Sequence, residues 1–84
     1  MQPNLKVEIT SPKGIIFSGF CYLAVVPSIA GDLGVMLGHE IVVTNLREGE
    51  VVLFDEKNNE IKKFVVKSGF SKVQEDGSLL VLID

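Results

Sequence analysis

Apolar and polar residues alternate along most of the chain with a period of two, and turn-forming residues interrupt the alternation at short intervals. This period places successive side chains on opposite faces of a β-strand. The first strand is the clearest, since Leu5, Val7 and Ile9 alternate with polar residues. A helical period over ten or more residues is not found anywhere. The pattern therefore predicts an all-β fold.

Gly, Pro, Asn and Asp, the residues that favour turns, divide the chain into short segments. We expect strands at residues 5–10, 15–17, 20–26, 35–37, 41–46, 51–54, 61–67, 70–74 and 79–83. Pro27 is expected to end its strand, residues 31–34 to form a glycine-containing loop, Ser68-Gly69 to form a bulge, and Asp76-Gly77 to form a type I′ turn. Many short strands with regular turns predict a sandwich or barrel.

Three of the expected strands, at residues 20–26, 51–54 and 79–83, are apolar on both faces. A sandwich normally keeps its outer faces polar. The composition is also apolar, at 46% hydrophobic residues with a mean hydropathy of +0.36, although a domain of this size buries only about 60% of its surface. We therefore expect a partner to cover an outer face. The alternative is a strongly curved sandwich covered by its own loops.

Charge and cysteine content exclude several classes of protein. The net charge of −3 argues against a nucleic-acid binder, which would carry a basic face. The apolar runs are much shorter than the ~20 residues that span a bilayer, so no membrane insertion is expected. Cys21 is the only cysteine and lies in an apolar strand, which favours a small buried side chain over a reactive thiol.

The candidate chemical residues are few and isolated. His39 is the only histidine, and a zinc site would need further ligands, so a structural or interface role is preferred. Asp32 and Glu40 can be read as an acid–base pair, but solvated loop charges or interface contacts are the preferred interpretation. The segment 31–34 lacks the following helix of a phosphate-binding loop. We expect no catalytic residue, no metal ligand and no cofactor.

Lys57 supports one rival interpretation. Lipoyl and biotinyl carrier domains are all-β, have a similar length and carry a modified lysine on a hairpin turn. The neighbours of Lys57, Glu56 and Asn58, do not match the residues that flank that lysine. Intact-mass spectrometry would reveal such an adduct. A sandwich that binds a small ligand remains a third, weaker alternative.

Residues 31–40 read Gly-Asp-Leu-Gly-Val-Met-Leu-Gly-His-Glu. This stretch resembles the Gly-Glu-Leu-Gly-Val-Leu-Pro-Gly-His-Ala stretch of the epsilon subunits of F-type ATP synthases. Residues 11–14, 17–19, 47–51, 68–73 and 79–84 are similar to further motifs of that family, in the same order. The sequence departs from the family at three positions, where Leu37 and Ile41 replace prolines and Ser68 replaces a glycine.

The resemblance implies a small flattened β-sandwich of about ten short strands, as a single domain over residues 1–84. The C-terminal helical hairpin that follows the sandwich in many family members is absent from this sequence. The implied role is that of a non-catalytic central-stalk subunit, which couples ion-driven rotation to ATP synthesis within a hetero-oligomeric complex. The implied location is peripheral, on the cytoplasmic face of the bacterial inner membrane or the equivalent face of another energy-transducing membrane.

The resemblance also implies two groups of contact residues for two partners, the gamma subunit and the polar loops of the c-ring. The c-ring contact comprises Ala30, Gly31, Asp32, Leu33 and Gly34. The gamma/ring interface comprises His39, Glu40, Ile41, Val42 and Val43. Asp32 is expected to face the ring loops, so Asp32→Lys is expected to weaken coupling without unfolding the domain.

Overall fold

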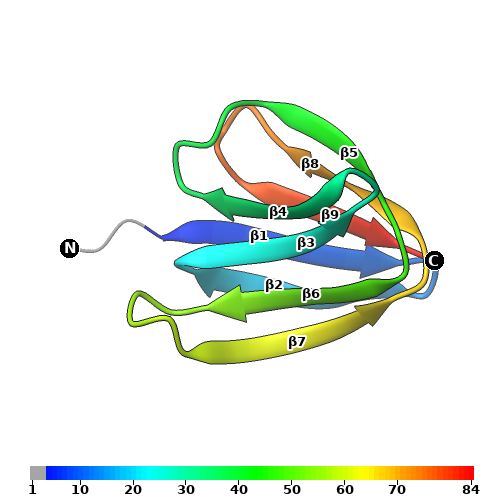
Figure 1. The fold of residues 1–84 in the computed structure, drawn as a ribbon, viewed down its shortest axis with the longest axis horizontal. Coiled ribbons are helices and arrows are strands. Elements are labelled where there is room, and N and C mark those ends of the chain that lie inside the picture. The colour runs from blue at the N-terminus through cyan, green and yellow to red at the C-terminus, as the bar shows by residue number, and fades with distance from the viewer. Residues whose placement is uncertain (1–3) are drawn as a thin grey trace.

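The structure, a computed structural model, describes residues 4–84, which form nine β-strands (Figure 1). The all-β expectation is confirmed, with nine strands in place of about ten. The strands are β1 (Leu5–Ser11), β2 (Gly14–Cys21), β3 (Leu23–Ser28), β4 (Gly31–Met36), β5 (Val42–Leu46), β6 (Gly49–Phe54), β7 (Glu60–Val66), β8 (Gly69–Val73) and β9 (Leu79–Ile83).

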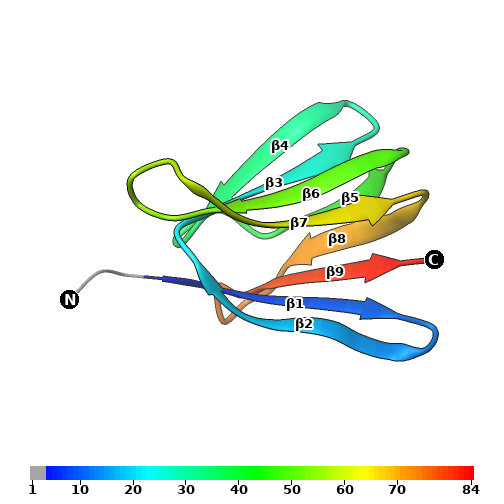
Figure 2. The same cartoon turned by 90° about the horizontal axis from the view of Figure 1, so that it is seen from below.

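The strands form one mixed sheet that folds over on itself. Hydrogen bonding orders them β2-β1-β9-β8-β5-β3-β6-β7, and β4 pairs with the remaining edge of β3. Strands β5 and β3 meet only at Ser28 and Leu46, and the sheet folds there. We call β4-β3-β6-β7 layer A and β2-β1-β9-β8-β5 layer B. Figure 2 shows the two layers edge-on, which gives the expected sandwich.

The core lies between the layers and is built from alternate strand positions. Layer B contributes Leu5, Val7 and Ile9 of β1, and layer A contributes Val51 and Leu53 of β6, all fully buried. At the open side, Phe17 of β2 packs against Phe64 of β7, with ring centroids 5.4 Å apart. Tilted aromatic pairs at this distance are favourable, so they join the two ends of the folded sheet.

The region around β3 differs from the sequence prediction. The expected strand at residues 20–26 is divided at Tyr22, whose backbone N–H donates to Phe54 O at 2.9 Å. Pro27 lies inside β3, so the prediction that it ends the strand is wrong. Its carbonyl accepts from the backbone N–H of Arg47, beyond the last β3–β6 pair at Val25, so no ladder donor is lost there.

The expected glycine-containing loop at residues 31–34 is also wrong, because these residues form the first part of β4. Glycines interrupt the apolar alternation and conceal the strand. The other half of the signal was correct, since residues 29–30 form the tight turn of a β3–β4 hairpin in which Ser28 is paired with Gly31.

Two turn predictions are also corrected. Gly77 has φ +88, but Asp76 has no positive φ, so Asp76-Gly77 does not form a type I′ turn. The N–H of Gly77 donates to Gln74 O, which fits a three-residue loop ending in a left-handed residue. The expected bulge at Ser68-Gly69 is the bend at which the chain passes from β7 in layer A to β8 in layer B.

Candidate functional site

The first group of predicted contact residues begins at the β3–β4 turn. We call residues 28–32 together with Arg47 the turn end. The backbone N–H of Ala30 donates to Ser28 Oγ at 3.2 Å, and that oxygen is also 2.8 Å from Thr44 Oγ1 on β5. The N–H of Ile29 donates to Asn45 O at 3.0 Å. The turn is therefore bonded both to itself and to β5.

Asp32 is the charged residue of this group, and it is paired. Arg47 Nη2 donates to Asp32 Oδ1 at 2.5 Å. The side chains remain 44% and 65% exposed for Arg47 and Asp32, so the pair lies on the surface. Arg47 comes from the connection between β5 and β6, far from Asp32 in sequence. The turn end thus presents an anchored ion pair to its surroundings.

The second group lies on the connection from β4 to β5. We call residues 37–43 the loop end. The backbone N–H of His39 donates to Met36 O at 3.1 Å, and its Nδ1 lies 2.8 Å from Glu40 O. Ile41 and Val43 are 59% and 60% exposed. Leu37 is exposed as well, so this end offers an apolar surface.

The two groups lie at opposite ends of one strand. Strand β4 begins at Gly31 and ends at Met36, a span of about 20 Å at the usual rise per residue. In Figure 1 the turn end lies on the right, near the C-terminus, and the loop end lies on the left. The structure separates residues that are close in sequence.

Individual members of the two groups differ in exposure. Ala30, Gly31 and Asp32 are exposed at the turn, and Gly34 is exposed along β4. Leu33 and Val42 are partly buried and pack against the core. Their side chains therefore support the two ends from below, while their neighbours offer the accessible surface.

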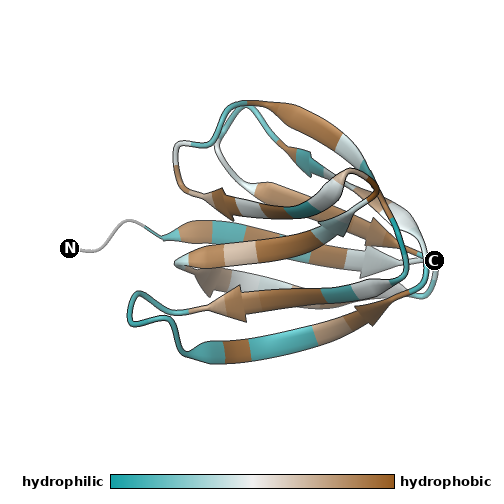
Figure 3. Ribbon diagram, in the orientation of Figure 1, coloured by the Kyte–Doolittle hydropathy of each residue, from teal (hydrophilic) through white to brown (hydrophobic). Residues whose placement is uncertain are grey.

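The apolar outer faces expected from the sequence are present. On layer A, Val25 is paired with Val52, and Leu23 is paired with both Phe54 and Met36. These five outward-facing residues are half-buried or exposed. Figure 3 shows hydrophobic colour running along β3 and β6 on this face. The apolar surface is continuous between the two ends of β4.

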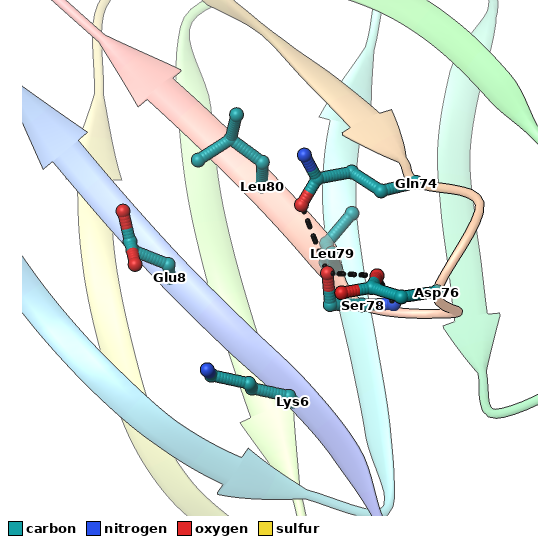
Figure 4. Close-up of a pocket in the computed structure, with 7 residues that line it drawn as sticks. All are labelled: Lys6, Glu8, Gln74, Asp76, Ser78, Leu79 and Leu80. Atoms are coloured by element: carbon teal, nitrogen blue, oxygen red, sulfur yellow. Dashed lines mark hydrogen bonds between the residues drawn. The ribbon is translucent and has the colours of Figure 1, made fainter.

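A shallow hollow of about 290 Å³ lies away from both ends, against β1, β9 and the β8–β9 turn (Figure 4). Ser78 Oγ donates to Gln74 Oε1 at 2.9 Å and lies 2.6 Å from Asp76 Oδ1. Hydrogen bonds from the side chain and backbone of Ser78 lower the pKa of Asp76. These polar groups bond to one another within the hairpin, which accounts for them without a ligand.

The remaining candidates have structural explanations. Lys57 lies in the three-residue loop of the β6–β7 hairpin, as expected, where its backbone N–H donates to Asp55 Oδ1 at 2.9 Å. The same hydrogen bonding of Asp55, mainly from Asn59, lowers the pKa of its carboxyl group. Cys21 is buried, and desolvation raises its pKa to about 11, so the thiol is unreactive at neutral pH.

Metal binding and membrane crossing leave no trace in residues 4–84. No group of three or more His, Cys, Asp or Glu side chains is placed to hold a metal ion among these residues. Within the same range there is no helix of the length and apolarity needed to cross a bilayer.

Sequence reasoning missed three residues that build the turn end: Ser28, Thr44 and Arg47. Each lies in a segment that reads as an ordinary strand or turn. Only the pairing of β3 with β4 and β5 brings them beside Asp32. A hydroxyl residue just before a tight turn was the one available signal, because such residues often accept a hydrogen bond from the residue two positions on.

Comparison with known proteins gives a consistent result. Residues 4–84 match the family described as "ATP synthase, Delta/Epsilon chain, beta-sandwich domain". The chain is 31% identical over 81 residues to ATP synthase epsilon chain 2 of Burkholderia orbicola, covering 96% of this chain and 53% of that protein. It is 36% identical over 78 residues to the ATP synthase epsilon chain of Lacticaseibacillus casei, covering 92% and 54%. The chain thus spans about half the length of the curated relatives it matches.

Solved structures show the same fold. A chain of the mitochondrial ATP synthase of Euglena gracilis, solved with OSCP, F1 and the c-ring, superposes with a TM-score of 0.85 at 20% identity, covering 99% of this chain and 52% of that chain. A chain from the central stalk and c-ring structure of the Tetrahymena thermophila mitochondrial ATP synthase gives a TM-score of 0.74 at 16% identity, covering 94% and 62%.

Proposed function

This chain belongs to the delta/epsilon chain family of ATP synthases, in which it matches the β-sandwich domain, and on that premise we propose that it is a non-catalytic coupling module of the central stalk. It binds the gamma subunit with one surface and the polar loops of the c-ring with another. Ring rotation driven by ion flow then turns the two as one body and supports ATP synthesis. The module sits peripherally on an energy-transducing membrane, on the cytoplasmic face if the source is bacterial.

One observation carries this proposal: two accessible surfaces of different chemistry lie at opposite ends of β4. The turn end is polar and carries the Asp32–Arg47 pair, whereas the loop end exposes Leu37 and Ile41. A module that joins two partners needs two separate surfaces with a stiff body between them. The β-sandwich supplies that body, since every described strand is paired along its length.

We assign the c-ring contact to the turn end. Ala30, Gly31 and Asp32 offer a protruding polar turn, which suits contact with polar loops. Gly34 continues the accessible surface along β4, and Leu33 supports it from the core side. Because interfacial charges act mainly on specificity and association rate, Asp32 serves to select and orient the ring.

We assign the gamma contact to the loop end. Ile41 and Val43 are exposed and apolar, and the half-buried Leu23 and Phe54 continue this surface over layer A. Val42 holds the loop onto the core, and His39 and Glu40 form a polar margin to the patch. An apolar centre with a polar rim is the usual anatomy of a protein interface. The separation of about 20 Å from the turn end favours gamma over the ring for this surface.

The experiment that tests the proposal measures binding of the chain to purified gamma subunit and, separately, to detergent-solubilised c-ring by calorimetry. Binding to gamma with a negative heat-capacity change is expected, because apolar surface is buried. Asp32→Lys should weaken binding to the ring and leave binding to gamma unchanged, and Ile41→Ser should do the reverse. If each variant weakens both partners equally, the assignment of two separate surfaces is wrong. If neither partner binds at micromolar concentration, the coupling role itself is wrong.

A further inference from the structure

The ion pair at the turn end has a purpose that stability does not explain. We propose that Arg47 is a positioning residue for Asp32. By holding one carboxylate oxygen, it makes the turn end an oriented hydrogen-bond acceptor with little net charge, and not a free anion. This inference rests on the proposed contact between Asp32 and the c-ring.

The backbone places the two side chains on either side of Pro27. Asp32 is paired with Pro27 across the β3–β4 hairpin. On the other side of β3, the backbone N–H of Arg47 donates to Pro27 O at 2.8 Å. The Arg47 side chain must therefore cross β3 to reach Asp32, and it crosses at a fixed position because its own backbone is bonded to that strand.

Gly49 leaves the space that this crossing needs. A Cβ atom at position 49 would lie 2.9 Å from Pro27 Cβ and 3.0 Å from Arg47 Nη1. Both distances are shorter than normal van der Waals contacts, so the guanidinium group and the proline ring fill the place of a side chain. Pro27 is fully buried although its neighbour Val25 on the same face is only half-buried. Arg47 and Gly49 together close this part of layer A.

The contact geometry leaves Asp32 able to bind a partner. Arg47 contacts only Oδ1, and Asp32 Oδ2 has no hydrogen-bond partner among residues 4–84. The second oxygen is therefore free to accept from a donor on a partner. Because the guanidinium group compensates the carboxylate charge, the attraction should depend on geometry more than on long-range charge.

Stability is a weak reason for this pair. Exposed ion pairs contribute little to folding, since solvent screens them and ordering two long side chains costs entropy. Its removal should leave the fold intact, which makes the pair accessible to a clean binding experiment. The partner chemistry that fits is a loop with a neutral or cationic hydrogen-bond donor at its tip.

The test is a double-mutant cycle with Asp32→Asn and Arg47→Gln, measured as affinity for the detergent-solubilised c-ring. Each single variant should weaken binding about fivefold, and Arg47→Gln should add less than about twofold to Asp32→Asn, because the two residues act as a unit. Arg47→Gln should also steepen the salt dependence, because it leaves Asp32 as an uncompensated charge. Arg47→Lys should restore the shallow salt dependence without restoring full affinity, because it lacks the planar fork.

Two control measurements separate the possible failures. In the chain alone, Asp32→Asn should shift the NMR resonance of the Arg47 Nε–H group, and thermal unfolding should stay unchanged. Additive effects of the two substitutions on ring binding would overturn the role of Arg47 while leaving the ring contact standing. If Asp32→Asn shifts the Arg47 resonance but leaves ring affinity unaltered, the ring contact of Asp32 fails, and the positioning role fails with it.

Discussion

The turn end and the loop end of β4 are held to the sandwich in different ways. At the turn end, Ser28, Thr44 and Asn45 tie the turn to β5, and Arg47 adds an ion pair to Asp32. At the loop end, the bonds itemised for residues 37–41 are local ones made by His39. The turn end is cross-linked to neighbouring strands, whereas the loop end relies on the packing of Val42.

This difference matches two kinds of docking. A surface that transmits torque to a ring gains from a fixed geometry, because a compliant contact would absorb rotation as deformation. An apolar surface that packs on a partner gains from local adjustment, because close packing needs complementary shapes. We expect the chain to bind its ring rigidly and to adapt to gamma.

The strongest test of the comparison uses two glycines. Gly69 lies beside the turn end, opposite Leu46, with φ +147, and an added Cβ would lie 2.0 Å from Leu82 O. Gly69→Ala should destabilise the fold by about 4 kcal/mol or more, since a backbone atom would have to move. Gly38 at the loop end has φ +91 and open space around it, so Gly38→Ala should cost only about 1–2 kcal/mol. Chemical denaturation measures both, and equal losses would contradict the contrast.

Alkaline pH provides the next test. Cys21 is paired with Leu5 on the same side of the sandwich as the loop end, and burial raises its pKa from 9.0 to about 11. Between these values the unfolded chain has lost a proton that the folded chain retains, so stability falls as pH rises from about 9 to about 11. The loss should be roughly 1 to 3 kcal/mol and should be absent below pH 9.

Cys21→Ala is the control for this pH dependence. It should flatten the alkaline part of the stability profile measured by urea unfolding, even though the smaller side chain lowers stability overall. An unchanged alkaline slope in this variant would show that other groups cause the loss.

A smaller effect is expected for the hydroxyl pair beneath the turn. Thr44→Val keeps the side-chain shape and removes the bond to Ser28, which should cost about 1 kcal/mol. Hydrogen exchange of the Ala30 and Gly31 amides should accelerate, while exchange at Gly38 and Ile41 stays the same. Acceleration at both ends would mean that the bond stabilises the whole sandwich and does not anchor the turn in particular.

The smallest effect on stability is expected for exposed apolar side chains. Ile41→Ser at the loop end and Ile29→Ser at the turn end replace similarly exposed residues, at 59% and 64%. Both should change the free energy of unfolding by less than about 0.5 kcal/mol. Only Ile41→Ser should weaken binding to gamma, as measured by calorimetry, and an equal loss for Ile29→Ser would remove the preference for the loop end.

Much of the strand pattern could be predicted because it depends on local alternation. The segments around Val7, Leu53 and Val81 were assigned correctly, since their inward side chains recur at every second position. Strand β4 was read as a loop over its first residues because Gly31 and Gly34 carry no side chain to mark a face. The break at Tyr22 was also missed, since both of its flanks are apolar and only a change of layer distinguishes them.

The sequence by itself determined the all-β class, the apolar outer faces and the segments that hold the contact residues, because hydrophobic period, turn chemistry and motif order are properties of the chain. Tertiary structure alone decided that residues 30–34 and 39–43 fall at opposite ends of β4, and that Arg47 reaches across Pro27 to Asp32. The physical reason is that strand pairing brings distant segments together, while an extended strand of about 20 Å separates residues that are close in sequence.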